Sequence, residues 1–250
     1  MFIMLGGTLL ITTTNVVIMF CAYECLLLPS WYIIKKFAKT SRGEFAALSM
    51  LIWTQLGACL LFLALGLIFG GGAVVSAAYS VYNLSESTTN LLLVLISLGF
   101  GTKMPIFPFY WWLLDAHVEV STNFSIILSG VSIKYAFIAY MRFLDWIGTA
   151  SCCWPIFLLI LYGFRDAMFR IDTECDIKRI VAYQTVVEMH LVAGLVMLNC
   201  DVFIDVIIFI LGGHCWLSTA SFIFVEIISR RYHTRNLELF VWHLLHVHLH

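Results

Sequence analysis

Three ionisable side chains lie deep inside long apolar segments of this chain, at Glu24, Lys103 and Lys134. Each is about half a bilayer thickness away from the nearest residues expected in water. A charge at that depth costs about 2.5–3.5 kcal/mol on insertion scales. Such residues usually face a protein-lined or hydrated interior, so they indicate an ion or proton pathway. For Glu24 the alternative is a protonated carboxyl group hydrogen-bonded to a neighbouring helix.

The elements that must position these residues are membrane-spanning helices. The chain has 250 residues, of which 62% are hydrophobic and 12% charged, a composition outside the range of soluble proteins. A spanning helix needs about 20 mainly apolar residues, so the hydropathy pattern predicts an all-α membrane protein with about eight transmembrane helices. The expected ranges are 1–14, 15–35, 45–70, 90–117, 121–142, 152–171, 178–200 and 203–229.

The charges between these segments support the count independently. If the helices alternate in direction, one face of the membrane has only Arg142, and Lys103 and Lys134 lie inside the membrane. The opposite face collects Lys35, Lys36, Lys39, Arg42, Arg165, Arg170, Lys178, Arg179, Arg230, Arg231 and Arg235. The positive-inside rule then predicts that the amino terminus faces the cytoplasm or the matrix of an organelle.

The segment that carries Lys103 is predicted to be a broken helix. Pro105 and Pro108 follow Lys103 within two turns, and each removes a backbone donor and clashes with the preceding turn. We therefore expect a break near residues 103–108. Broken membrane helices occur where the freed backbone groups face water or protein, and they recur at transport sites. Snorkelling of the lysine to an interface is the alternative, but apolar sequence extends on both sides.

Further titratable groups extend the predicted pathway beyond Lys103. Lys134 is a second lysine that can lose its proton when desolvated, and the two would form successive proton stations. Glu188 and His190 lie in the middle of one span, and His214 lies in the next. A lone buried histidine is often only hydrogen-bonded. Three titratable groups on adjacent spans fit a proton relay as well as they fit ordinary hydrogen-bonded residues.

Asp115, His117 and Glu119 lie between the spans that carry the two lysines. They fit a solvated turn that caps helices as well as they fit proton exchange. The eight cysteines, mostly within spans, show no zinc spacing and are predicted to be small buried apolar residues. A net charge of −1 gives no indication of a nucleic-acid partner.

Several motifs resemble antiporter-like subunits of the proton-pumping NADH:ubiquinone oxidoreductase (respiratory complex I), and chain 4 among them. Lys103 begins KMPIFPFYWWLLDAHVEVS, which is similar to the family's KMPxxxxHxWLPxAHVEAP. Lys134 lies in SIILSGVSIKYAFIAYMR, which is similar to GSxxLAGxLLKxGxYGxxR. Glu24 lies in FCAYECLLLP, similar to FYxxFExxLxP. His214 lies in GGHCWLSTASFIF, similar to xAHGLxSSLLF. The AHVE block with its two flanking lysines favours chain 4 over chains 2 and 5.

The chain departs from the family pattern in two ways. Glu188 stands where DLKxLIAYSSVSHMxL has its central histidine, and His190 follows two residues later. Family members have about fourteen spans in two inverted five-helix repeats. The resemblance therefore divides this chain into a first antiporter-like repeat (1–143), a partial second repeat (150–230) and a C-terminal tail (231–250). We expect either a second polypeptide that supplies the missing helices or a reduced subunit, as in a divergent protist mitochondrial genome.

The resemblance implies a membrane-arm subunit that translocates protons and is coupled to NADH oxidation and ubiquinone reduction. Glu24 is expected to pair with Lys103, and protons to pass through Lys134 toward Glu188 and His214. His117, Glu119 and His190 are expected as secondary relay residues. The chain itself is expected to bind no metal, NADH, FMN, iron–sulfur cluster or ubiquinone, with lipids such as cardiolipin as candidate ligands.

The implied partners are the lipid bilayer, accessory subunits and the antiporter-like subunits similar to chains 2 and 5. The implied location is the mitochondrial inner membrane, with the amino terminus on the matrix side. A bacterial plasma membrane is the less favoured alternative. An Mrp-type cation/proton antiporter subunit and a structural membrane-arm spacer without pumping remain alternative functions. A haem-binding cytochrome is disfavoured because no two spans carry the paired histidines that bis-histidine haem requires.

Overall fold

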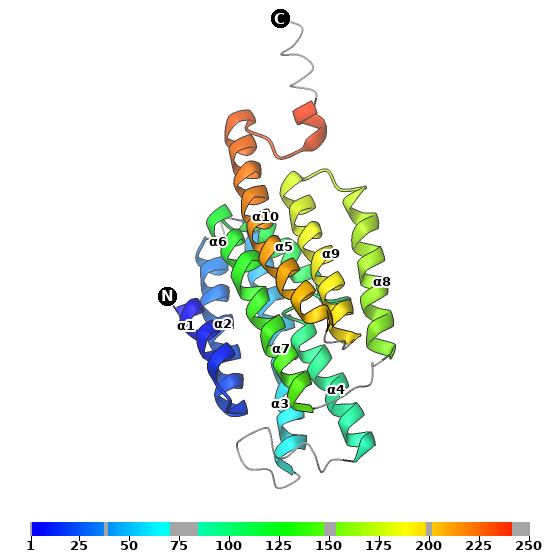
Figure 1. Cartoon of the computed structure of the whole chain (residues 1–250). Helices are drawn as coiled ribbons and strands as arrows, with labels where there is room; N and C mark the ends of the chain where they lie inside the picture. Colours follow the sequence, from blue (N-terminus) through cyan, green and yellow to red (C-terminus); the bar gives the residue numbers. More distant parts are fainter. Residues whose placement is uncertain (1, 38–39, 71–84, 148–153, 199–201, 242–250) are drawn as a thin grey trace, which may run out of the picture.

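The computed structural model describes residues 2–37, 40–70, 85–147, 154–198 and 202–241. Within these residues the regular elements are helices, apart from one isolated bridge between Asp176 and Asn236. The helices run side by side in a bundle (Figure 1). Their bounds are α1 Phe2–Thr12, α2 Val16–Phe37, α3 Ser41–Gly70, α4 Glu86–Gly101, α5 Trp111–Glu119, α6 Thr122–Ile127, the π-helical turn η3 Leu128–Ser132, α7 Ile133–Ile147, α8 Trp154–Ile171, α9 Ile177–Met197 and α10 Val202–Tyr232.

Each of the eight predicted spans contains at least one of these helices. In the part of the chain that the structure describes, five helical stretches are long and apolar enough to cross a membrane: Val16–Phe37, Ser41–Ile68, Thr122–Ile147, Ile177–Met197 and Phe203–Tyr232. The helix α1 has 11 residues and rises only about 16 Å, against an apolar thickness of about 30 Å. The protein is therefore a multi-pass membrane protein, while the full count of eight spans stays a prediction.

The basic helix ends lie together, at the upper end of the bundle in Figure 1. The ends of α2, α8 and α10 and the starts of α3 and α9 point toward that end of the bundle (Figure 1). At the opposite end, Arg142 of α7 donates hydrogen bonds to the carbonyl oxygens of Leu10, Ile11 and Thr13. A cation there satisfies carbonyls that the last turn of α1 leaves unpaired. Lys39 lies outside the described residues.

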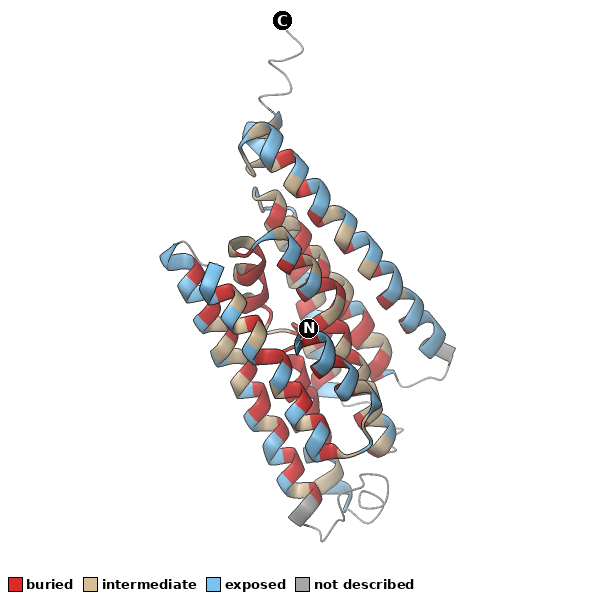
Figure 2. Ribbon diagram, turned by 90° about the vertical axis from the view of Figure 1, so that its left-hand side faces the viewer, coloured by how far each residue is buried: buried red, intermediate tan, exposed pale blue. Residues whose placement is uncertain are grey.

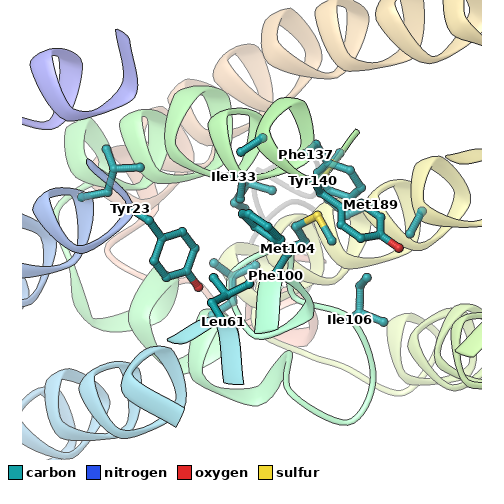
Figure 3. Packing of buried hydrophobic residues seen from close by; sticks show 14 of the residues in the cluster. Tyr23, Leu61, Phe100, Met104, Ile106, Ile133, Phe137, Tyr140 and Met189 are labelled. Carbon is teal, nitrogen blue, oxygen red and sulfur yellow. The ribbon is translucent and has the colours of Figure 1, made fainter. Parts of the chain in front are cut away.

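Burial follows the inside of the bundle (Figure 2). Many large apolar side chains are exposed on its outside. On α10, Phe209 is 80% exposed and Trp216 is 82% exposed. Backbone groups are paired within each helix, so such faces can meet acyl chains at no polar cost. Inside, Met104 beside the break packs in one apolar cluster with Ile133 and Phe137 of α7 (Figure 3).

The prediction that the cysteines are buried is wrong for most of those described. Cys21, Cys25, Cys59 and Cys175 are exposed on the protein surface, and Cys215 is partly exposed. An apolar segment in a membrane has a lipid-facing side as well as a protein-facing side, and both accept a thiol. Hydrophobicity alone therefore does not predict which side a cysteine occupies. Cys152, Cys153 and Cys200 lie outside the described residues.

The predicted break at Lys103 is confirmed. The helix α4 ends at Gly101, α5 begins at Trp111, and Pro105 and Pro108 lie in the turns between them. A second irregularity was not predicted. The π-helical turn η3 interrupts the span that continues as α7, directly before Lys134. Turns of this kind insert one residue into a helix and are frequent at functional sites.

Candidate functional site

Lys103 is buried at the start of the break, with 4% of its surface exposed. Its ammonium nitrogen Nζ donates a 2.8 Å hydrogen bond to the main-chain oxygen of Tyr23 on α2. The same nitrogen lies 3.8 Å from the centre of the Tyr23 ring. A cation over an aromatic face is stabilised by about 2 kcal/mol when it is desolvated. Both interactions favour the charged lysine in a place where the membrane opposes it.

Glu24 is the next residue along α2, but its carboxylate is held away from the lysine. Oε2 accepts a 3.1 Å hydrogen bond from Nε2 of Gln55 on α3. Oε1 is buried and has no hydrogen-bond partner among the described residues. None of the ion pairs within 4.0 Å in the described part of the chain includes Glu24 or Lys103. Glu24 and Lys103, the predicted pair, therefore belong to one site but form no ion pair with each other.

Glycines let the helices close around this lysine. A Cβ atom added at Gly57 of α3 would lie 2.0 Å from Oγ1 of Thr102 and 2.6 Å from the oxygen of Gly99. A Cβ atom at Gly99 would lie 2.7 Å from Cγ of Leu61. Side chains do not tolerate such approaches. The two glycines thus allow α3 and α4 to meet directly beside the break.

The break leaves backbone groups that side chains must satisfy. Nε1 of Trp112 donates a 2.7 Å hydrogen bond to the oxygen of Thr102. The main-chain nitrogen of Phe107 donates a 2.9 Å hydrogen bond to Nε2 of His190 on α9. Tyr110, at the end of the break, donates a hydrogen bond to Asp166 of α8. The irregular backbone is therefore held from both sides by polar side chains, as non-helical backbone at membrane depth requires.

Lys134 is buried, with 7% of its surface exposed, and one residue, Ile133, separates it from the end of the π-helical turn. Its Nζ atom donates a 2.5 Å hydrogen bond to the main-chain oxygen of Ser129, inside that turn. The extra residue of a π-helical turn shifts the backbone bonding pattern, so a carbonyl oxygen is available to a side chain. The turn thus positions the second lysine as the break positions the first.

Ser129 connects this lysine to α9 and α10. Its hydroxyl group lies 2.6 Å from Oγ of Ser218 and 3.3 Å from Nε2 of His214, both on α10. It also lies 3.3 Å from Oγ1 of Thr185 on α9. Hydroxyl groups both donate and accept, so a chain of them can pass protons. The lysine and the histidine therefore meet on one residue, one at its carbonyl oxygen and the other at its hydroxyl group.

His214 continues the connection to Glu188. Nδ1 of His214 lies 2.5 Å from Oε2 of Glu188, an ion pair when the ring is protonated. The other carboxylate oxygen, Oε1, accepts a 3.1 Å hydrogen bond from Gln184. The structure thus brings together Lys134, His214 and Glu188, as a relay requires. Glu188, which stands where the family motif has a histidine, thus contacts His214, which matches the histidine of another family motif.

The other predicted residues are dispersed. His117 is buried, stacks on Phe222 at 4.9 Å, and has no hydrogen-bond partner at either ring nitrogen among the described residues. Glu119 accepts a 2.9 Å hydrogen bond from Thr40, and Asp115 lies 3.8 Å from Arg179. These carboxylates are part of polar contacts between helix ends. His190 contacts the break rather than Glu188.

Sequence reasoning missed the small polar residues that join the titratable groups. Ser129, Thr185 and Ser218 look like ordinary members of apolar spans. Helical spacing could have identified two pairs, since His214 and Ser218, and Gln184 and Glu188, are four residues apart and share a face. The π-helical turn that presents Ser129 has no sequence signature of this kind.

Comparisons with known proteins identify the family of this chain. The sequence model of the family described as NADH:quinone oxidoreductase/Mrp antiporter, TM matches residues 13–242. NADH-ubiquinone oxidoreductase chain 4 of Paramecium tetraurelia is 29% identical over 229 residues, which cover 90% of this chain and 48% of the relative. The protein of the same name from Arabidopsis thaliana is 29% identical over 226 residues, which cover 88% and 46%. The resemblance to chain 4 is thereby confirmed, and the chain spans about half the length of these relatives.

Solved structures share the fold. An archaeal membrane-bound sulfane sulfur reductase superposes with a TM-score of 0.82 at 18% identity, over 95% of this chain and 50% of that chain. The Mrp complex of a Dietzia species gives 0.82 at 22%, over 94% and 26%. Respiratory complex I of Thermus thermophilus gives 0.75 at 22%, over 88% and 48%. All three belong to membrane complexes, and the antiporter-like membrane fold predicted from the sequence is confirmed.

Proposed function

The chain belongs to the NADH:quinone oxidoreductase/Mrp antiporter family of membrane proteins, and on that basis we propose that it is a membrane-arm subunit of a proton-translocating NADH:ubiquinone oxidoreductase. In this role the chain moves protons, and other subunits hold the redox cofactors. The enzyme activity belongs to the assembled complex. The relatives named chain 4 support this role over that of a stand-alone transporter.

One observation carries the proposal: a polar connection runs from Lys134, at the carbonyl oxygen of Ser129, through the hydroxyl group of the same serine and His214 to Glu188. It crosses from α7 of the first repeat to α9 and α10 of the second. A purely structural spacer does not need a titratable group at each end of such a connection. A lysine, a histidine and a carboxylate that share hydrogen bonds can each hold a proton in turn.

The order of steps follows from the contacts. A proton on Lys134 reaches the hydroxyl group of Ser129 once the ammonium group turns from the carbonyl oxygen to the hydroxyl oxygen of the same residue. That hydroxyl group passes a proton to Nε2 of His214, and Nδ1 of His214 releases one to Glu188. No hydrogen bond joins Lys103 to Lys134 among the described residues, and their chain neighbours Met104 and Ile133 belong to one apolar cluster (Figure 3). Proton transfer from Lys103 to Lys134 therefore requires internal water.

The proposal includes a location and partners. The basic helix ends gathered at one end of the bundle support a matrix-facing surface on that side. The amino terminus then lies on the matrix side of the mitochondrial inner membrane, and eukaryotic relatives support that membrane. The partners are the other membrane-arm subunits, including antiporter-like neighbours similar to chains 2 and 5.

Proton counting in vesicles tests the function. The assembled complex is reconstituted, and the protons moved per NADH oxidised are measured for wild type, Lys103→Met and Lys134→Met. We expect both variants to lose the share of protons that this subunit contributes. Lys36→Met is the matched control, because that lysine is exposed at the basic end of α2 and lies outside the pathway.

Two results would contradict the proposal. Unchanged proton stoichiometry in the variant with both lysines replaced would support a spacer whose relay is not used. Sodium-dependent proton movement without NADH would support an Mrp-type cation/proton antiporter.

A further inference from the structure

The imidazole ring of His190 lies between α9 and the break that separates α4 from α5. Its Nε2 atom accepts the 2.9 Å hydrogen bond from the main-chain nitrogen of Phe107. Its Nδ1 atom lies 2.7 Å from the main-chain oxygen of Val186. A carbonyl oxygen only accepts and an amide nitrogen only donates, so Nδ1 carries the proton and Nε2 is free of one. The contacts therefore fix His190 as a neutral ring in a single tautomer.

Helix α8 covers this contact closely. A Cβ atom added at Gly163 would lie 2.2 Å from Nε2 of His190 and 2.5 Å from Cβ of Phe107. The rings of Phe107 and Tyr162 meet with centroids 4.7 Å apart, and only 1% of the His190 surface is exposed. Water therefore cannot easily replace the imidazole as the acceptor for the Phe107 amide. The main-chain amide of Phe107 is therefore paired only while Nε2 of His190 accepts its hydrogen bond.

The charged and titratable groups around the ring are already engaged with one another. On α8, Oδ2 of Asp166 accepts a 2.9 Å hydrogen bond from Arg170 and another from Tyr110 of the break. The Tyr110 ring lies edge-on to His190 at 6.1 Å, and Tyr183 of α9 lies 6.4 Å from Tyr110. None of these four side chains hydrogen-bonds to His190. A second proton on the ring would therefore place two N–H groups face to face across 2.9 Å.

We propose that His190 is a positioning residue that fixes the break while it is neutral and releases it when protonated. Protonation at Nε2 removes the acceptor of the Phe107 amide and loosens the turns between Gly101 and Trp111, which begin with Lys103. A proton on the second repeat would thus change the position of a lysine on the first. The value of this coupling to pumping rests on the proposed function, whereas the proton-sensitive contact itself does not.

Hydrogen exchange of the assembled complex tests the contact without reference to pumping. The protection factor is measured by mass spectrometry for the peptide 104–110, after correction for the intrinsic exchange rate at each pH. As the pH is lowered from about 7 to about 4, we expect wild-type protection to fall at least about tenfold, because the contacts that favour the neutral ring must break before it takes up a second proton. A peptide from α7 serves as the internal control and should keep its protection.

Two variants separate the proton effect from packing. His190→Gln offers an amide oxygen as acceptor but takes up no proton, so its protection should be independent of pH. Gly163→Ala displaces the ring at any pH, so its protection should be low throughout. If wild-type protection does not change with pH, or if His190→Gln falls as wild type does, the proposal is wrong. Loss of pumping in lysine variants leaves this result unaffected, so the two proposals fail separately.

Discussion

The two buried lysines occupy contrasting surroundings within one bundle. Lys103 lies at a helix break, and among the described residues its ammonium group hydrogen-bonds to the carbonyl oxygen of Tyr23 and lies over the ring of that residue. Lys134 lies after a π-helical turn and joins a polar cluster that reaches α10. The first lysine is a separate station whose carboxylate neighbour is bonded elsewhere. The second is one end of a connected path.

The difference teaches which step needs movement. Proton transfer from Lys134 toward Glu188 needs only small rotations, because Ser129, His214 and Glu188 are already in contact through their side chains and Lys134 lies at the carbonyl oxygen of the same serine. Transfer from Lys103 needs water in an apolar region or a shift of the break. Both lysines lie at an irregular stretch of backbone. The break between α4 and α5 can move as a unit, whereas the π-helical turn inside a continuous helix offers a fixed carbonyl oxygen.

The largest effect is expected from Glu188, the far end of the connected path. We expect Glu188→Gln to lower the rate of proton translocation about a hundredfold, because a positioned proton-transfer group contributes at least that much. Glu188→His keeps a titratable group at the place where the family has its histidine, so it should fall between Gln and wild type. The initial rate of vesicle acidification during NADH oxidation measures the series. Equal rates for Gln and wild type would mean that the path ends before Glu188.

Alanine substitutions at glycines probe how tightly each lysine site is packed. We expect Gly57→Ala to destabilise the fold by about 1–3 kcal/mol, because the new Cβ atom meets Thr102 and Gly99 beside Lys103. Gly130→Ala, in the π-helical turn, places its Cβ atom 3.4 Å from Cys215, so the cost should be small. The free energy of unfolding of the full chain in bicelles is the measurement.

Gly66 provides the control for this pair, because a Cβ atom there has nothing within 4 Å. Gly66→Ala should leave the free energy of unfolding unchanged or slightly raise it. If Gly57→Ala behaves like Gly66→Ala, the close approach of α3 and α4 at Lys103 is not present in the protein.

The Tyr23 ring distinguishes the two parts of the Lys103 site. Tyr23→Leu removes the aromatic face and the hydroxyl group, so it should cost about 3 kcal/mol of unfolding free energy, of which about 2 kcal/mol is the desolvated cation–π contact. Tyr23→Phe removes only the hydroxyl group, which donates a 3.3 Å hydrogen bond to Gly99, and should cost about 1 kcal/mol. Tyr135→Leu on α7 is the comparison variant at the other lysine. Tyr135 directly follows Lys134, and the Tyr135 ring makes no cation–π contact among the described residues. Equal losses in Tyr23→Leu and Tyr23→Phe would remove the ring from the account.

Much of the fold could be predicted from residue types alone. Apolar length gave the helical segments, and the two prolines gave the break, because both depend on local covalent and solvation physics. The lipid-facing cysteines and the π-helical turn could not be predicted in this way. The former depend on which side of a helix meets another helix, and the latter on how one extra residue is accommodated.

The candidate site divides along the same line. Titratable residues at membrane depth are costly and therefore conspicuous, so Lys103, Lys134, Glu188 and His214 were predicted. Their contacts depend on the three-dimensional packing of ordinary residues. Ser129 is therefore found only from coordinates, and so is the bond that holds Glu24 to Gln55 rather than to Lys103.

The central claim is that Ser129 connects Lys134 of α7 to His214 of α10, and its hydroxyl group can be removed alone. Ser129→Ala keeps the main-chain oxygen that binds Lys134 but removes the link to His214. Ser132→Ala is the matched control, because its buried hydroxyl group in the same π-helical turn has no hydrogen-bond partner among the described residues. The rate of proton translocation in vesicles of the assembled complex is measured for both. We expect about a tenfold loss for Ser129→Ala, as a hydrogen bond worth about 1.4 kcal/mol in the transfer step implies, and no loss for Ser132→Ala. Identical rates in the two variants would contradict the connection.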